Sequence, residues 1–128
     1  MKDIKKAISP WYLPQMDGIP YKFITENLDG FGIEYRPEFI AVHQLKGSQK
    51  EVDLNKVESL RKVSSEKLPP IFVSENLYIL DGHSRTASKK YEDKNAKIHT
   101  IRIGADEKDS ATMLRIIQDR WEQKNKNI

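Results

Sequence analysis

The sequence contains no cysteine, which excludes disulfide bridges, thiolate metal sites and any reaction that proceeds through a thiol nucleophile. It also has no apolar run of the roughly 18 residues that a membrane-spanning helix needs. Its N-terminal stretch, MKDIKKAISPWYLPQ, carries charges but lacks the apolar segment of a signal peptide. Together these absences predict a soluble, cytoplasmic protein.

A large excess of one charge is missing as well. The chain has 22 lysines and arginines against 19 acidic residues, which gives a net charge of only +3. A protein dedicated to nucleic-acid binding usually shows a larger excess of positive charge or a compact basic block. The balance therefore permits a polyanionic partner without arguing for one.

The length of 128 residues, with 38% hydrophobic and 32% charged residues, predicts a single globular domain, 1–128. Residues 1–37 hold more than half of the prolines and of the aromatic residues. Such dense prolines argue against long helices, whereas the aromatic rings need something to pack on. We expect an irregular N-terminal segment (1–37) that either wraps on its own domain or forms a flap over a ligand or partner. A core (38–104) and a C-terminal helix (105–128) follow it.

Hydrophobic periodicity predicts the elements of that core. In chain order we expect a strand at 38–45, a helix at 54–63, a strand pair at 70–73 and 77–80, a helix at 86–94, a strand at 97–103 and an amphipathic helix at 109–128. Asp53 is a good N-cap for the first helix, and Asp109 or Ser110 for the last. The residues between the paired strands predict a hairpin turn. The order predicts the α/β (α+β) class, with a small mixed sheet and flanking helices.

One stretch, YILDGHSRTASKKY, carries the chemistry of greatest interest. It predicts a buried strand that ends at Asp81 and turns at Gly82 into a helix capped by Ser84 or Thr86. The first amide N–H groups of such a helix have no acceptor inside the helix, and the positive end of its dipole favours anions. The start of the helix is therefore a candidate phosphate site.

The side chains around this turn suit the same chemistry. Arg85 can hold two phosphate oxygens at once, and Ser84 and Thr86 add hydroxyl donors. Asp81 can hold Mg²⁺ or accept a proton from a substrate hydroxyl, and His83 can donate to a phosphate or act as an acid or base. The alternative is a plain turn, because Asp-Gly is also a strong signal for a β-hairpin.

Other polar residues give weaker signals. The three histidines are far apart and include no His-x-x-x-His pair, so the sequence does not predict a zinc site. The acidic residues Glu51, Asp53 and Glu58 either meet near a site or cap and solubilise a helix.

The set EVDLNKVESLRK, LPPIFV, LYILDGHSRTASKKY and KIHTIRI resembles the core of the ParB/sulfiredoxin-like superfamily. The resemblance covers roughly Phe39 to Ile103. Members bind nucleotide phosphates with the loop after the strand: ParB partition proteins bind CTP, and sulfiredoxins use ATP. Free serine kinases carry Asp-Gly-His-x-Arg and transfer phosphate to a small hydroxyl substrate, and the loop of this chain is most similar to theirs.

The resemblance implies that the loop from Gly82 to Arg85, with the following Thr86, binds nucleotide phosphates. Asp81 matches the acid at the end of the strand, and Glu51 matches one catalytic acid of the kinases, while Lys50 stands where a second acid is expected. Sulfiredoxin chemistry is excluded because the chain has no cysteine.

Two functions follow from the residues and the resemblance. The first is a nucleotide-binding ParB-like domain, with ATP, ADP or CTP and Mg²⁺, that acts as a phosphotransferase or NTPase. Its catalytic residues are Asp81, His83 and Glu51. The second is a non-catalytic accessory protein of a plasmid or phage that binds DNA or a protein, a group in which some short relatives are described as nucleases.

Overall fold

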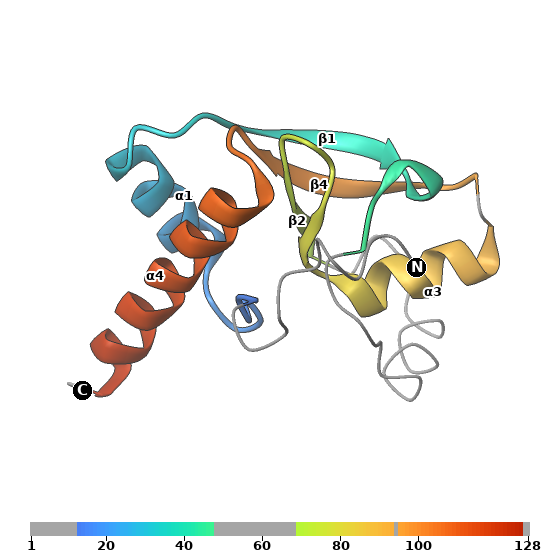
Figure 1. The fold of residues 1–128 in the computed structure, drawn as a ribbon. Coiled ribbons are helices and arrows are strands. Elements are labelled where there is room, and N and C mark those ends of the chain that lie inside the picture. The colour runs from blue at the N-terminus through green and yellow to red at the C-terminus, as the bar shows by residue number, and fades with distance from the viewer. Residues whose placement is uncertain (1–12, 48–68, 94, 127–128) are drawn as a thin grey trace.

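The computed structural model describes residues 13–47, 69–93 and 95–126 (Figure 1). In chain order the elements are α1 (Tyr21–Gly30), β1 (Tyr35–Ala41), the short 3₁₀ helix η3 (Val42–Gln44), β2 (Ile71–Ser74), β3 (Ile79–Asp81), α3 (His83–Glu92), β4 (Lys97–Ile103) and α4 (Glu107–Lys126). The predicted helix at 54–63 and the acidic residues Glu51, Asp53 and Glu58 lie outside the described residues.

The four strands form one mixed sheet in the order β1-β4-β2-β3. β4 runs antiparallel to β1 and parallel to β2, while β2 and β3 form an antiparallel pair. This arrangement confirms the predicted class, a small mixed α+β sheet with flanking helices. The predicted hairpin is also confirmed, because the amide of Ser74 donates to the carbonyl of Tyr78 across the turn, at 2.9 Å.

The first strand differs in extent from the prediction. β1 begins at Tyr35 and ends at Ala41, before the predicted end at residue 45. Ala41 pairs with Lys97, the first residue of β4, so that the sheet offers no partner further along the chain. Beyond Ala41 the chain turns into η3, and the apolar residues that resembled a continuing strand bury their side chains there instead.

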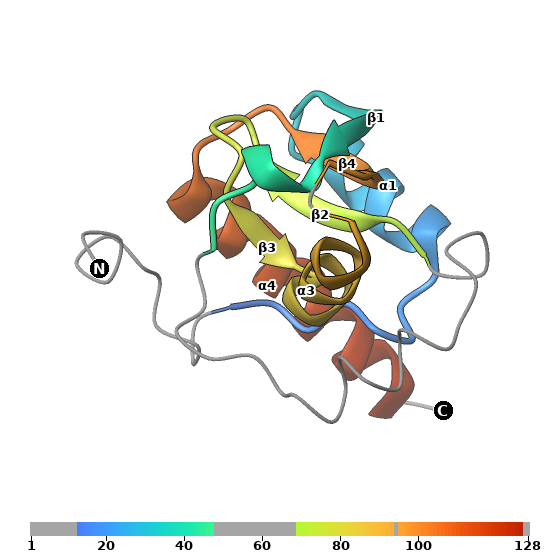
Figure 2. The same ribbon diagram turned by 90° about the vertical axis from the view of Figure 1, so that its right-hand side faces the viewer.

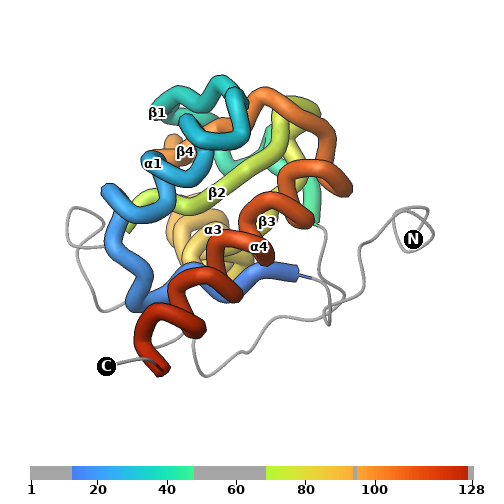
Figure 3. The backbone as a smooth tube through the Cα atoms, turned by 90° about the vertical axis from the view of Figure 1, so that its left-hand side faces the viewer, coloured from blue at the N-terminus to red at the C-terminus, as the bar shows by residue number. Residues whose placement is uncertain are grey.

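Apolar layers on both faces of the sheet hold the fold together. Figure 3 shows α1 and α4 together on one side of β2, with α3 behind it. The larger layer joins α1 and α4 to the sheet; its most deeply buried members are Ile24, Leu28, Leu80, Ile101, Ile103, Leu114 and Ile117. The smaller layer on the opposite face comprises Ile40, Ile71 and Val73, packed against Leu45, Leu77 and Ile98. Figure 2 views the molecule from the side on which η3 and α3 lie.

The expectation that residues 1–37 are irregular is wrong for Tyr21–Gly30, which form α1. Pro20 occupies the N-cap position of this helix, where the missing N–H of proline costs no hydrogen bond. The aromatic residues pack on the domain itself: the Phe23 ring meets Trp121 edge-on at 5.0 Å between centroids. Among the described residues this agrees with a segment that wraps on its own domain.

The last helix begins two residues before its predicted start. Neither Asp109 nor Ser110 precedes the helix, since α4 starts at Glu107. The carboxylate of Asp106 instead accepts a hydrogen bond from the amide of Asp109, at 2.9 Å. Asp106 therefore caps the start of the helix, the role that was predicted for Asp109 or Ser110. None of the helices among the described residues is both long and apolar enough to cross a membrane.

Replacing this cap tests the assignment. We expect Asp106→Ala to lower the free energy of unfolding by about 1 kcal/mol, because the first-turn amide of Asp109 loses its acceptor. Urea denaturation followed by circular dichroism measures the change. Asp109→Ala is the matched control, since it removes a carboxylate from the same turn and keeps the capping bond. A larger loss for Asp109→Ala than for Asp106→Ala would contradict the assignment.

Candidate functional site

The predicted turn after β3 delivers the chain directly into a helix. α3 begins at His83, so the predicted start at Thr86 is three residues late. The predicted side-chain caps are wrong as well. Gly82 is the N-cap and has no side-chain capping bond, while the Thr86 hydroxyl donates back to the Gly82 carbonyl at 2.9 Å. This strand-to-helix connection excludes the plain hairpin alternative, because no second strand follows Gly82.

A register irregularity in the β2–β3 pair aims Asp81 at the site. Phe72 pairs with Asp81 and Val73 with Ile79, so Leu80 is an extra residue in β3. Such a bulge changes the face toward which the next side chain points. Cross-strand partners share a face, and Phe72 and Asp81 do line the same cavity.

A glycine is required at position 82 because the turn packs against Ile71. Its φ of 108° lies in the left-handed region, and a Cβ there would stand 2.2 Å from the Cγ2 atom of Ile71. Ile71 is fully buried in β2. The glycine therefore lets the turn pack closely on the sheet, whereas the sequence alone suggested close approach to a ligand.

We expect Gly82→Ala to lower the free energy of unfolding by about 2–4 kcal/mol, because it adds backbone strain to a clash with a buried side chain. Chemical denaturation measures the loss. Gly30→Ala serves as the control, since a Cβ at this helical position meets nothing within 4 Å. We expect that control to be neutral or slightly stabilising. Equal stability of the two variants would refute the packing argument.

Arg85 is the most highly connected side chain of the turn. Its side chain is 9% exposed, and Nη1 donates to the carbonyl of Pro69 at 2.9 Å and to that of Pro70 at 3.4 Å. Nη2 donates to Oδ2 of Asp81 at 3.2 Å and lies 3.8 Å from Oδ1 of Asp17. In this conformation Arg85 ties the two prolines of the LPPI motif to the DGHSR turn.

A small cavity opens beside this arginine. Its volume is about 140 Å³. The polar lining includes the side chains of Asp17, Asp81 and Arg85, and the rest is mainly apolar: Met16, Gly18, Ile19, Tyr21, Ile24, Pro69, Pro70 and Phe72. Binding sites for drug-sized ligands usually measure about 300–1,000 Å³. The cavity is thus large enough for a phosphoryl group and too small for a whole nucleotide.

His83 is buried, with 8% of its surface exposed. Burial disfavours the charged imidazolium and lowers the pKa of His83 from 6.5 to about 4. At pH 7 the side chain is therefore neutral. It can take part in hydrogen bonds, but it supplies no positive charge to a phosphate.

This burial predicts a dependence of stability on pH. The unfolded chain binds a proton at His83 as the pH falls below 6.5, while the folded chain does so only near pH 4. Stability is therefore complete above pH 6.5 and falls as the pH drops, by about 3 kcal/mol at pH 4 from this residue alone. Urea denaturation at several pH values measures it. His83→Gln should lose less stability over this interval than the wild type, and identical losses would contradict the assignment.

The other predicted site residues differ in position. Asp81 is 11% exposed and contacts Arg85, and Ser84 is partly exposed in the first turn of α3. Thr86 is buried, and its hydroxyl donates to the Gly82 carbonyl, so that donor is already used within the helix. Glu51 lies outside the described residues. The part of the chain that the structure describes holds no group of three or more acidic or histidine side chains suited to a metal ion.

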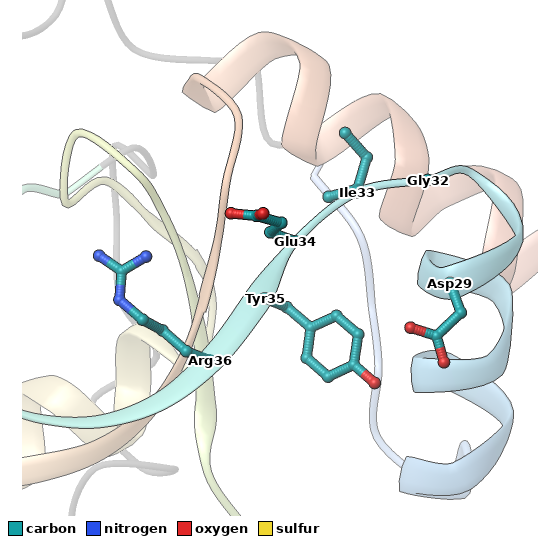
Figure 4. A pocket seen from close by; sticks show the side chains of 6 residues that line it. All are labelled: Asp29, Gly32, Ile33, Glu34, Tyr35 and Arg36. Carbon is teal, nitrogen blue, oxygen red and sulfur yellow. The ribbon is translucent and has the colours of Figure 1, made fainter.

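A second hollow lies between α1 and the start of β1, at Asp29 and residues 32–36 (Figure 4). Its volume is about 540 Å³. Figure 4 shows the Tyr35 ring on the side of Asp29, whereas Arg36 extends in the opposite direction. Its charged groups do not converge, as those of a ligand site normally do. None of the predicted site residues that the structure describes lines it.

Sequence reasoning missed two contributors to the site. The carbonyls of Pro69 and Pro70 act through the backbone and leave no residue-type signal. Asp17 is marked in the sequence only by the Asp-Gly pair at 17–18, which is a turn signal like the one at 81–82. Only the fold brings these two Asp-Gly turns to the same arginine.

Comparison with family models and with curated proteins gives no match. Among solved structures, the chain is similar to a Pnob8-like ParB-N domain, with 22% sequence identity and a TM-score of 0.47. The similarity covers 62% of this chain and 34% of that one, so it spans about a third of the length of the solved chain. The resemblance to the free serine kinases stays a prediction from the sequence.

Proposed function

We propose that this protein is a ParB-like domain that binds the phosphate groups of a nucleotide beside the N-terminus of α3. The observation that carries the proposal is the position of Arg85. Its guanidinium is buried and lines a cavity next to the first turn of the helix. A fixed guanidinium in the first turn of a helix, beside the positive end of the helix dipole, is an arrangement that recognises phosphate oxygens.

The size of the cavity limits which part of a nucleotide enters. At about 140 Å³ it accepts a phosphoryl group, and the sugar and base then remain outside. Recognition of the base would need other residues. The cavity itself therefore gives no preference among ATP, ADP and CTP.

A magnesium ion fits the chemistry of the carboxylates present. Mg²⁺ is commonly bound through one or two carboxylates together with substrate phosphates and water. Asp81 at the cavity would supply such an oxygen. The ion would neutralise part of the phosphate charge.

Phosphotransfer or nucleotide hydrolysis requires catalytic groups in addition to a binding site. Asp81 would hold the metal or orient a hydroxyl group, and neutral His83 would contribute only hydrogen bonds. A general base is still needed for transfer to a hydroxyl group, and Glu51 is the sequence candidate. Enzyme activity is thus a further step of the proposal, which nucleotide binding alone would not establish.

Isothermal titration with ATP, ADP and CTP in the presence of Mg²⁺ tests the binding step. We expect saturable binding with a dissociation constant below about 1 mM. Ser84→Asp should weaken it at least about tenfold, because it places a negative charge at the helix start where the phosphate binds. The same substitution should not weaken the fold, since an acidic side chain is favourable in the first turn of a helix.

Thr112→Asp is the matched control, because it adds the same charge at an exposed position of α4. We expect this control to bind as the wild type does. Arg85→Lys keeps the positive charge but loses the paired donors, and it should also bind less tightly. Absence of binding of all three nucleotides to the wild type at millimolar concentration would end the proposal. Product analysis with and without serine then separates a kinase or NTPase from a binding domain.

A further inference from the structure

A second Asp-Gly turn stands at the mouth of the candidate cavity. The amide of Ile19 donates to the carbonyl of Met16 at 3.2 Å, which closes a four-residue turn. Gly18 has a φ of 82°, the left-handed value that a type II turn requires at its third position. Asp17 occupies the second position, at the tip. Met16, the first residue of the turn, is buried in the core and anchors the turn to the domain, while the tip is exposed.

Asp17 faces the same guanidinium nitrogen as Asp81. Oδ1 of Asp17 lies 3.8 Å from Nη2 of Arg85, and Oδ2 of Asp81 lies 3.2 Å from it. The two carboxylates differ in depth, since the side chain of Asp17 is 59% exposed and that of Asp81 is 11% exposed. Asp17 is therefore the outer partner and has the longer contact.

The other terminal nitrogen of this arginine points to protein oxygens, because Nη1 donates to the carbonyls of Pro69 and Pro70. A phosphate oxygen that approaches Nη2 must therefore share or replace one of the contacts of that nitrogen. The contact with Asp17 is the easier one to break, because it exceeds hydrogen-bond length and its carboxylate regains water when it moves away.

We propose that Asp17 is an internal competitor that occupies the outer side of Arg85 and that an anionic ligand displaces it. This inference rests on the proposed function, because it concerns the same cavity. With Asp17 in place, two carboxylates face one guanidinium, and the three groups together carry a net charge of −1. The turn thus lowers the affinity for anions and favours phosphate groups that arrive with a divalent cation.

Removing this carboxylate should strengthen binding. We expect Asp17→Asn to bind ATP, and inorganic pyrophosphate as a smaller probe, about tenfold more tightly than the wild type at low salt. The gain should shrink as sodium chloride is added, because the competing charge is exposed and screened. Isothermal titration at two salt concentrations, with and without Mg²⁺, measures both effects. The fold should be unaffected, which a melting curve checks.

Asp29→Asn is the matched control. It makes the same change of charge at an exposed position of α1 that does not line the cavity. We expect its affinities to equal those of the wild type. A gain of similar size in Asp29→Asn would show a general effect of net charge and overturn the proposal.

The outcomes separate this inference from the function on which it rests. If the wild type binds and Asp17→Asn binds equally or more weakly, the competitor is refuted and the phosphate site stands. If only Asp17→Asn binds, the competitor is supported and the wild type fails the binding test of the proposed function. If neither protein binds ATP or pyrophosphate at millimolar concentration, the phosphate site and its competitor fail together.

Discussion

The buried guanidinium of Arg85 is the group on which the geometry of this region depends. A charge removed from water is tolerated only when it is paired and hydrogen-bonded. Here the carbonyls of Pro69 and Pro70 and the carboxylate of Asp81 meet that requirement. Because these partners lie at the entry of β2 and at the end of β3, one side chain fixes the start of α3 against both strands.

Under the proposed function, Arg85 would be both a structural and a ligand-binding residue. If Arg85 also binds phosphate, a ligand draws on donors that already hold the fold together. Loss of the side chain would remove one hydrogen-bond donor from the buried carboxylate of Asp81, and a stability defect would accompany any binding defect. A change at Asp17, which lines the cavity, or at the partly exposed Ser84 would report on the ligand with less disturbance of the fold.

The sequence predicted the elements whose periodicity is local and strong. β4 has the predicted bounds, and α4 is the predicted amphipathic helix, with Leu114 and Ile117 buried. The helix α1 was missed because prolines dominated the interpretation of residues 1–37, although Pro20 only precedes that helix. A proline at a helix start and one inside it look alike when the boundary is unknown.

The site was predictable in composition and not in geometry. The turn from Asp81 to Arg85 was singled out by residue type, and the structure does place Asp81 and Arg85 in contact. No pattern in the chain revealed that Gly82 packs on Ile71, because that contact depends on how β2 lies beneath the turn. Pairing of Asp17 with Arg85 spans 68 positions and arises only when α1 and α3 have been placed.

The groups at the turn favour binding over chemistry in the part of the chain that the structure describes. Asp81 accepts a hydrogen bond from Arg85, which occupies one oxygen that a general base would use. Burial keeps His83 neutral at pH 7 and turns most of its surface away from solvent, so it is poorly placed to exchange protons with a substrate. A transfer reaction at this cavity would therefore need a base from elsewhere in the chain, and the Glu51 hypothesis matters for that reason. Without such a base, the same residues would form a phosphate sensor whose occupancy moves the Asp17 turn.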